Sequence, residues 1–215
     1  PDSTVQVTYI QTPWAFVDIR SKVRDGNEKS MAFAGVTVVK NEESSSIPPL
    51  VKWHACLDMD EMFVDCQERW IEAEDQPRPT PDVGYFQDVS NEVSTPHTYH
   101  EYDPDRMYLE EWVRIDDGGE KFLAVRDESG QRVLVVAGKY WAYASQSENV
   151  FVSGIVKDCQ YENKKNWLIE SSATERSNET KSVFFELPNQ AEISWKLLKG
   201  STLPLDTIHS LIQER

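Results

Sequence analysis

The chain has 215 residues, which is enough for one large all-β domain or two small ones. With 39% hydrophobic and 27% charged residues it has the composition of a soluble globular protein, and no run approaches the roughly 18 apolar residues of a membrane helix. Lys and Arg total 22 against 37 Asp and Glu, and this net charge of −15 argues against nucleic acid or an anionic membrane as a partner.

Cysteine usage and the N-terminus bear on the cellular compartment. Cys56, Cys66 and Cys159 are too few for a disulfide framework, and no CxxC pair is present to bind zinc. The first residues lack a charged-then-apolar signal pattern, so we expect a reducing, cytoplasmic location. The chain begins without Met, which leaves open that a preceding segment was removed. The acidity is interpreted first as a source of solubility, and steering of a cationic ligand is the less favoured interpretation.

Runs rich in Val, Ile, Phe, Tyr and Trp, divided by turn residues, predict strands along most of the chain. In chain order the runs are Val5–Gln11, Trp14–Arg20, Met31–Lys40, Leu50–Met59, Met62–Glu68, Gly84–Val89, Thr98–Tyr102, Tyr108–Asp116, Lys121–Asp127, Arg132–Ala144, Val150–Cys159, Asn166–Thr174, Ser182–Leu187 and Ile193–Leu198. They predict an all-β, antiparallel fold in a single domain spanning residues 1–215.

The run Trp14–Arg20 has two unlike faces. Strict alternation places Ala15, Val17 and Ile19 on one, apolar face. It places on the opposite face the four residues Trp14, Phe16, Asp18 and Arg20. Further along, Leu50–Met59 places Trp53 and His54 on opposite faces. The segments Lys40–Pro49 and Glu72–Asp82 are rich in proline and polar residues, so we predict long loops there.

The stretch "HTYHEY" contains His97, His100 and Glu101 and resembles a metal-ligand cluster. Residues three apart on a strand point to opposite faces, so the two histidines diverge and we predict no metal site. His54, inside a well-formed strand, is the better candidate for acid–base chemistry, although a lone histidine there is more often structural.

The run Tyr108–Asp116 repeats the pattern of Trp14–Arg20. One of its faces carries Tyr108, Glu110, Trp112 and Arg114, and the other Leu109, Glu111, Val113 and Ile115. If the aromatic and charged faces point inward, they form a pocket wall in which Arg20 and Arg114 pair with Asp18 and Glu110. In the opposite orientation the apolar residues form the core, and the aromatic residues make cross-strand pairs outside. The sequence leaves both orientations open.

Turn residues organise the second half of the chain. Asp116–Lys121 and Asp127–Arg132 predict hairpins, and three hairpin-linked strands from Tyr108 to Ala144 would form a meander. Within "KYWAYAS", Trp141 and Tyr143 alternate with small residues, and Gly138 marks a bulge or barrel corner in the long run Arg132–Ala144. An amphipathic pattern predicts a C-terminal helix over residues 204–214. A closed or nearly closed antiparallel barrel is the preferred architecture, with a sandwich as the main competitor.

The strand number, the terminal helix and segments such as "QTPWAFVDIR", "MAFAGVTVV" and "YLEEWVRID" give the chain a resemblance to the calycin group, the lipocalin-like β-barrels. The resemblance spans most of the chain. It implies a barrel with a cavity for a small, partly apolar ligand, and it assigns no catalytic residue.

Three functions follow from these residues. The first is binding of a small, partly apolar molecule, with an anionic group as one option, by a cavity whose wall we predict to include Trp14, Phe16, Arg20, Trp53, Tyr108, Trp112, Arg114 and Trp141. The second is a cofactor-free lyase, isomerase or cyclase, in which Asp18, Glu110 or His54 moves a proton. The third is an interaction protein with a filled core, for example a homodimer. The usual phosphate-loop, hydrolase and dinucleotide motifs are missing from the sequence, so no cofactor is expected.

Overall fold

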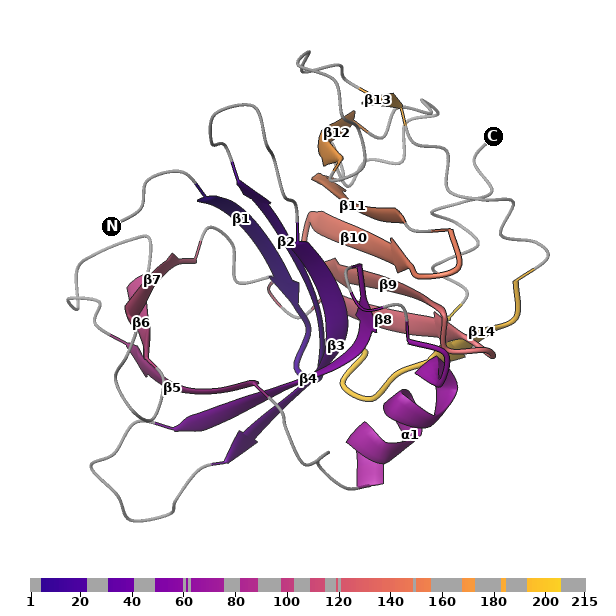
Figure 1. Ribbon diagram of the computed structural model, residues 1–215, viewed down its shortest axis with the longest axis horizontal. Helices are drawn as coiled ribbons and strands as arrows, with labels where there is room; N and C mark the ends of the chain where they lie inside the picture. The colour runs from indigo at the N-terminus through magenta and orange to yellow at the C-terminus, as the bar shows by residue number, and fades with distance from the viewer. Residues whose placement is uncertain are drawn as a thin grey trace.

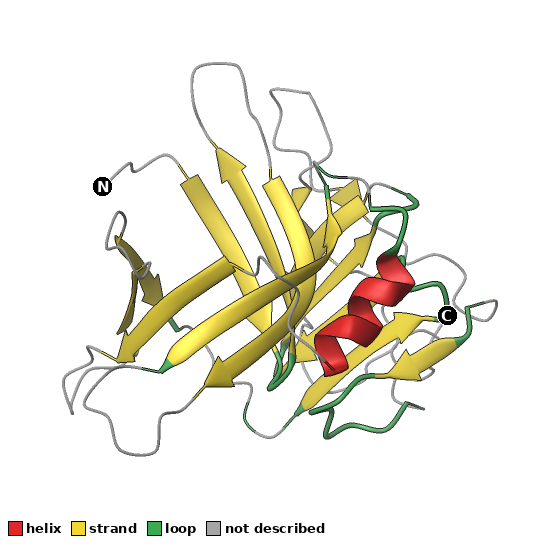
Figure 2. Cartoon of the chain, turned by 60° about the horizontal axis from the view of Figure 1, so that its bottom comes forward, coloured by secondary structure: helices red, strands yellow, loops and turns green. Residues whose placement is uncertain are grey.

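A computed structural model of the chain describes residues 5–22, 31–40, 49–59, 61, 63–75, 82–88, 98–102, 109–114, 119, 121–148, 150–155, 168–172, 183–184 and 193–205. These residues form two antiparallel sheets and one helix (Figures 1 and 2). The predicted all-β, antiparallel class is therefore confirmed. No helix in the described ranges has the length and apolar character needed to cross a membrane.

The first sheet, here called the curled sheet, has seven strands that neighbour one another in chain order. They are β1 (Val5–Gln11), β2 (Ala15–Lys22), β3 (Met31–Lys40), β4 (Leu50–Asp58), β5 (Asp82–Asp88), β6 (Thr98–Tyr102) and β7 (Leu109–Val113). Figure 1 shows the sheet bending around on itself, so that β7 lies across from β1 and β2. Among the described residues, the two edge strands, β1 and β7, form no backbone pairing with each other.

The second sheet also has seven strands, in the order β13-β12-β11-β10-β9-β8-β14. Their bounds are β8 (Phe122–Asp127), β9 (Arg132–Ala137), β10 (Tyr140–Ser145), β11 (Val150–Ile155), β12 (Leu168–Ser172), β13 (Val183–Phe184) and β14 (Trp195–Leu197). The predicted hairpin at Asp127–Arg132 is confirmed, because β8 pairs with β9 across it.

Two other turn predictions are corrected. The run Arg132–Ala144 is two strands rather than one, because Gly138 has φ of 59° and turns the chain between β9 and β10. The segment Asp116–Lys121 is not a hairpin, because β7 pairs with β6 in the curled sheet while β8 pairs with β9 and β14 in the second. The meander therefore begins at β8, runs through β9 and β10, and continues into β11, β12 and β13.

The two sheets pack on each other through small and β-branched side chains, here called the inter-sheet core. The curled sheet contributes alternate residues of β2 and β3, and the second sheet contributes alternate residues of β8, β9 and β10; among them are Ala15, Val17, Ile19, Ala32, Ala34, Val36, Ala124, Val133, Val135, Ala142 and Ala144. The apolar face predicted for β2 is thus confirmed as core. The opposite face of the second sheet forms an outer core with Trp195 of β14, made of Leu123, Val125, Leu134, Val136, Trp141 and Tyr143.

The helix α1 (Cys66–Asp75) replaces the predicted strand Met62–Glu68 and the start of the predicted loop Glu72–Asp82. Asp65 precedes its first turn, and its Oδ1 accepts a hydrogen bond of 2.9 Å from Nε of Arg69. Cys66 and Trp70, one turn apart, are both buried on the face toward the sheets. The predicted helix over residues 204–214 lies, apart from residues 204 and 205, outside the described residues.

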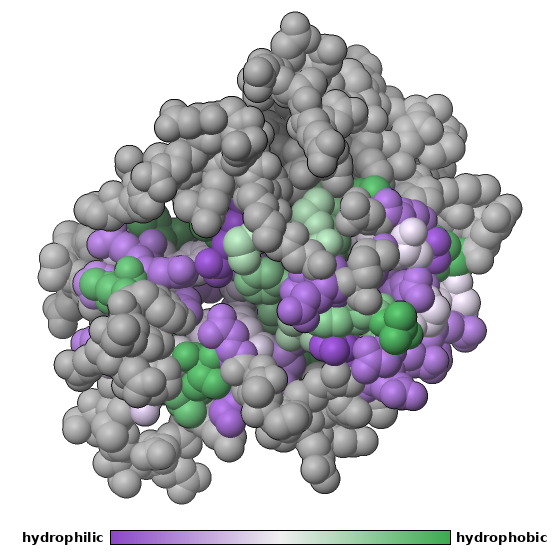
Figure 3. Space-filling model, viewed as in Figure 1, coloured by the Kyte–Doolittle hydropathy of each residue, from purple (hydrophilic) through white to green (hydrophobic). Residues whose placement is uncertain are grey.

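The face seen in Figure 3 carries hydrophilic residues interspersed with hydrophobic ones at the left, over β5–β7, and mainly hydrophilic residues at the right, toward α1 and β14. Apolar residues gather between these two areas, where the middle strands of the curled sheet and the second sheet meet.

Candidate functional site

Side chains from the two ends of the curled sheet meet on its inner side. Arg20 on β2 reaches Glu110 on β7, with 3.3 Å between Nη1 and Oε1. Tyr9 on β1 and Trp112 on β7 form an edge-to-face pair, with 5.5 Å between ring centroids. Because β7 lies at the opposite edge from β1, these contacts must cross the concave face. The charged and aromatic faces of β2 and β7 therefore both point inward.

We call the residues gathered there the concave cluster. Its members are Tyr9, Phe16, Asp18, Arg20, Phe33, Trp53, Glu101, Glu110 and Trp112, which come from β1, β2, β3, β4, β6 and β7. Strand register explains part of the grouping, because Tyr9 and Phe33 are the cross-strand partners of Asp18 on its two sides.

Arg20 occupies the centre of the concave cluster. Its Nε donates to Oδ2 of Asp18 at 3.0 Å, and its Nη2 lies 2.9 Å from the same oxygen. The guanidinium carbon lies 5.5 Å from the ring centroid of Phe33 and 6.0 Å from that of Trp112. The cation is thus held by carboxylates from both ends of the sheet and by two aromatic rings.

Tyr9 links the charged centre to the aromatic wall. Its ring stacks on Phe16 with centroids 5.6 Å apart. Its hydroxyl accepts a hydrogen bond of 2.9 Å from Nε1 of Trp53 and donates one of 2.9 Å to Oε1 of Gln11. Burial, first of all, raises the pKa of this phenol, so Tyr9 stays neutral and acts as a fixed hydrogen-bonding group.

Glu101 sits beside a like charge. It is the cross-strand partner of Glu110 and only 6% exposed. Gly84 on β5 allows the close packing, because a Cβ there would lie 3.0 Å from Cγ of Glu101 and 3.1 Å from Cζ3 of Trp53. Burial raises the pKa of Glu101 to about 7, helped by the charges of Glu110 and Asp82. The indole N–H of Trp112 opposes the rise, although its nitrogen has no partner of normal hydrogen-bond geometry among the described residues.

Asp18 is the most buried charge of the cluster, with 1% of its side chain exposed. Burial raises its pKa to about 6 in spite of the opposing effect of Arg20, and the charges of Glu110 and Asp82 add to the rise. Its second oxygen, Oδ1, is buried and has no hydrogen-bond partner among the described residues. Burial lowers the pKa of Arg20, but the carboxylates of Asp18, Glu110 and Glu101 more than offset this effect and keep the pKa above its ordinary value.

The structure brings together, facing inward as in one of the two orientations that the sequence leaves open, five of the residues named from the sequence: Phe16, Asp18, Arg20, Glu110 and Trp112. Trp53 joins them through Tyr9. Arg114 follows β7 and is exposed, and Tyr108 lies outside the described residues.

His54 faces away from this cluster. It is the cross-strand partner of Val36, which belongs to the inter-sheet core, and the alternation of β4 separates it from Trp53. His54 is 4% exposed, and neither ring nitrogen has a partner within the described ranges. Burial, together with Lys52, lowers its pKa, so the ring is neutral at physiological pH.

Two tryptophans named as ligand-binding also lie elsewhere. Trp14 belongs to the inter-sheet core, because β2 begins only at Ala15 and the alternation does not extend back to it. Thr12 holds this entry to the strand, its Oγ1 accepting hydrogen bonds from the backbone N–H of Trp14 at 3.4 Å and of Ala15 at 3.0 Å. Trp141 is 1% exposed and lies in the outer core.

The histidine-containing strand holds no ligand set. His100 lies 3.5 Å from Glu111, its cross-strand partner, on the side of β6 away from Glu101, and His97 lies outside the described residues. Within the described part of the chain, no three His, Cys, Asp or Glu side chains are placed to hold a metal ion.

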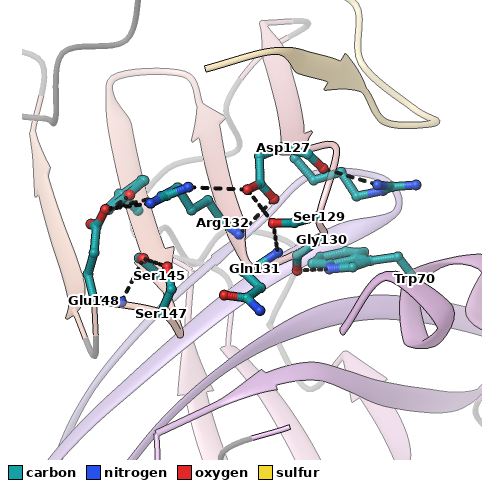
Figure 4. Close-up of polar contacts among 11 residues, drawn as sticks. Trp70, Asp127, Ser129, Gly130, Gln131, Arg132, Ser145, Ser147 and Glu148 are labelled. Atoms are coloured by element: carbon teal, nitrogen blue, oxygen red, sulfur yellow. Dashed lines mark hydrogen bonds and ion pairs between the residues drawn. The ribbon is translucent and has the colours of Figure 1, made fainter. Parts of the chain in front are cut away.

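A second polar network, on the second sheet, joins residues of its hairpin turns (Figure 4). Asp127 accepts hydrogen bonds from Oγ of Ser129 at 2.6 Å and from the backbone N–H of Arg132 at 3.1 Å. Glu148 binds Nη2 of Arg132 at 2.9 Å through Oε1 and the hydroxyl of Tyr143 at 3.1 Å through Oε2. Each carboxylate oxygen is engaged by the protein itself, so this network is a structural feature.

The sequence analysis missed three members of the concave cluster: Tyr9, Phe33 and Glu101. Their strands were predicted, but which residue faces Asp18 depends on pairing register, which alternation within one strand does not supply. Glu101 is part of the stretch "HTYHEY", but the histidines of that stretch suggested a metal site rather than a buried carboxyl group. Comparison of the chain with protein-family models, curated proteins and solved structures gives no match.

Proposed function

We propose that the protein binds a small, partly apolar molecule on the concave face of the curled sheet. One observation carries the proposal: Arg20 lies close to the rings of Phe33 and Trp112 while carboxylates from both ends of the sheet bind it. An interior that serves only stability is usually filled with apolar side chains, because the desolvation penalty of a buried ion pair often exceeds its Coulombic attraction. Aromatic walls with a few fixed polar groups are characteristic of ligand sites.

The finer classification belongs to the same proposal. Seven antiparallel strands that neighbour one another in chain order are the arrangement expected of an up-and-down, lipocalin-like barrel of the calycin type. A small ligand also fits the net charge of −15 better than nucleic acid or an anionic membrane does. Cys66 is a free, buried thiol, which fits the proposed cytoplasmic location.

The test uses the tryptophans as internal reporters. A library of neutral, anionic and cationic aromatic fragments is added to the protein, and the indole N–H resonances are followed by two-dimensional NMR. We expect binding fragments to shift Trp53 and Trp112 while leaving Trp70, Trp141 and Trp195 unchanged, because these three are buried away from the concave face. A library that shifts none of the concave indoles, or shifts all indoles alike, would contradict the proposal.

A second function, acid–base catalysis on the bound molecule, is favoured by the raised pKa values of Asp18 and Glu101, at about 6 and about 7. Carboxyl groups that titrate near neutrality exchange protons efficiently. Asp18→Asn and Glu101→Gln should each lower the turnover of a bound molecule by about a hundredfold, and Glu111→Gln should not. Turnover that survives both substitutions would remove these groups from the reaction.

A further inference from the structure

We infer that the ligand of the concave face is an organic cation, an amine or ammonium group on an aromatic or aliphatic body, bound by Asp18 with Glu101 and Glu110. This inference rests on the proposed small-molecule function and names the chemical class of its ligand. It reverses the expectation of an anionic molecule held by arginine.

The charges of the concave cluster are unbalanced. Asp18, Glu101 and Glu110 carry up to three negative charges, and Arg20 is the cation that contacts two of them and influences the third. Arg20 already directs its Nε and Nη2 at Asp18 and its Nη1 at Glu110. An anionic ligand would have to break these bonds and add a further negative charge, whereas a cation would reduce the excess.

An unused acceptor points to the same class. Oδ1 of Asp18 is buried and has no partner among the described residues, although Oδ2 of the same carboxylate binds Arg20. An ionised carboxylate only accepts hydrogen bonds, and leaving one of its oxygens buried without a donor is costly. An ammonium group supplies both a donor and the missing positive charge.

The aromatic residues around this oxygen suit a cation as well. Phe33 and Trp112 already hold the guanidinium of Arg20 over or near their rings, and Tyr9 packs against Trp112 and Phe16. A positive charge is attracted by the electron-rich ring faces. A metal ion is the less suitable cation, because the described side chains provide no group of three ligands placed to hold one.

Protonation of the same carboxyls makes the binding depend on pH. Without ligand, burial holds the pKa of Asp18 at about 6 and that of Glu101 at about 7, with Glu110 and Asp82 raising both and Arg20 lowering both. A bound ammonium favours the ionised carboxylates, so binding releases protons and the affinity rises with pH. Tyr9 stays neutral throughout this range and does not contribute.

The experiment compares three probes that differ in their head group: 2-phenylethylamine, 2-phenylethanol and 3-phenylpropionate. Dissociation constants are measured at pH 8 and pH 5 from the NMR shifts of the Trp53 and Trp112 indoles. At pH 8 we expect the amine to bind at least about tenfold more tightly than the other two, because a charged donor meets a buried carboxylate. At pH 5 the advantage of the amine should fall by about tenfold.

Substitutions locate the binding charge. Asp18→Asn, which keeps the shape of the side chain, should weaken amine binding by about tenfold and remove the part of the pH dependence that comes from Asp18, leaving the part that comes from Glu101. Glu110→Gln should act in the same direction. Glu111→Gln is the matched control, because it removes one charge from the same strand on the face away from the cluster and should leave binding unchanged.

The outcomes separate this inference from the proposed function. If the alcohol or the carboxylate shifts the concave indoles as strongly as the amine, the cationic class is wrong and the small-molecule function stands. If the alcohol and the carboxylate bind but the amine does not, the inference is also overturned. If none of them binds, the cationic inference fails, and the fragment library described above decides the broader function.

Discussion

Asp18 combines almost complete burial with a charge. One of its oxygens is engaged by Arg20, the other lies without a protein partner among the described residues, and burial raises its pKa to about 6. A carboxyl group whose pKa is raised by folding binds its proton more tightly in the folded state than in the unfolded state. Its contribution to stability is therefore full below the unfolded pKa and is lost as the pH rises through the folded value.

This gives a first prediction about stability. Between about pH 4 and pH 6 the wild-type protein should lose free energy of unfolding relative to Asp18→Asn, by an amount on the order of 3 kcal/mol. Chemical denaturation at a series of pH values measures the difference. A stability difference that stays constant over this range would show that Asp18 has an ordinary pKa in the folded protein.

His54 titrates with the opposite sign. Its pKa is lowered by burial, so its contribution to stability is full above the ordinary value near 6.5 and is lost as the pH falls through the folded value. His54→Leu should leave stability at pH 7 unchanged or raise it by about 1 kcal/mol, because two buried polar atoms are removed. The variant should also lose less stability than the wild type between pH 7 and pH 5, measured by the same denaturation series. A loss of several kcal/mol at pH 7 would show that the ring nitrogens are satisfied.

Sequence alternation predicted single residues well where a regular strand continues. It placed Phe16, Asp18 and Arg20 on one face of β2, and the structure confirms this. Alternation failed at Trp14, because a bend held by Thr12 precedes the strand. The partner of Asp18 on β1 could not be predicted, since register depends on the whole hairpin.

At the scale of elements, α1 shows what a strand-centred interpretation overlooked. Asp65 before the first turn and the pair Cys66 and Trp70 one turn apart are helical signals. The segment is short, and its aromatic residue also suits a strand, so local composition did not decide. Tertiary contact decides instead: Nε1 of Trp70 donates a hydrogen bond of 2.8 Å to the carbonyl of Gly130 in the β8–β9 turn.

A second prediction concerns this turn. Gly130 has φ of 73°, and a Cβ there would lie 2.8 Å from the backbone of Gln67 and 2.9 Å from Cδ1 of Trp70. Gly130→Ala should therefore cost about 2–4 kcal/mol, from the left-handed conformation together with the clash against α1. Gly119→Ala is the matched control, because its φ is 55° and the space around it is open, so it should cost about 1 kcal/mol. Equal losses in thermal unfolding would show that α1 does not pack against the turn.

At the scale of the whole molecule, the two sheets approach each other through alanines. Ala15, Ala32 and Ala34 of the curled sheet face a second sheet whose contribution includes Ala142 and Ala144. Small residues on both sides leave little room for a larger side chain. This close contact is the reason why both faces of β2 are buried, one against the second sheet and one inside the curl.

The third prediction tests the closeness of the sheets. Ala142→Leu should lower the free energy of unfolding by about 1–3 kcal/mol through overpacking. Lys196→Leu, at an exposed position of β14, should change it by less than about 0.5 kcal/mol. A neutral effect of Ala142→Leu in denaturant titration would mean that the inter-sheet core contains unfilled space.

The class of fold could be predicted from strand-like runs and turns, but the division into two sheets could not. The change of sheet takes place between β7 and β8, where "DDGGEK" has the composition of an ordinary hairpin turn. The local sequence of such a turn does not show whether the two flanking strands pair with each other or belong to different sheets. That depends on strands distant in the sequence, such as β14, which pairs with β8.

The pairing of β14 with β8 has a consequence for how the chain folds. Every pairing in the curled sheet joins strands that are consecutive in the chain. These pairs can therefore form one after another as the polypeptide is synthesised. In the second sheet, strands β8 to β13 also pair in chain order, but β14 must return to β8, where Trp195 pairs with Asp127, before the outer core is covered. Closing so long a loop is slow. The docking of β14 should therefore be the last and rate-limiting event of folding, and until then Leu123, Val125 and Trp141 remain open to misassociation.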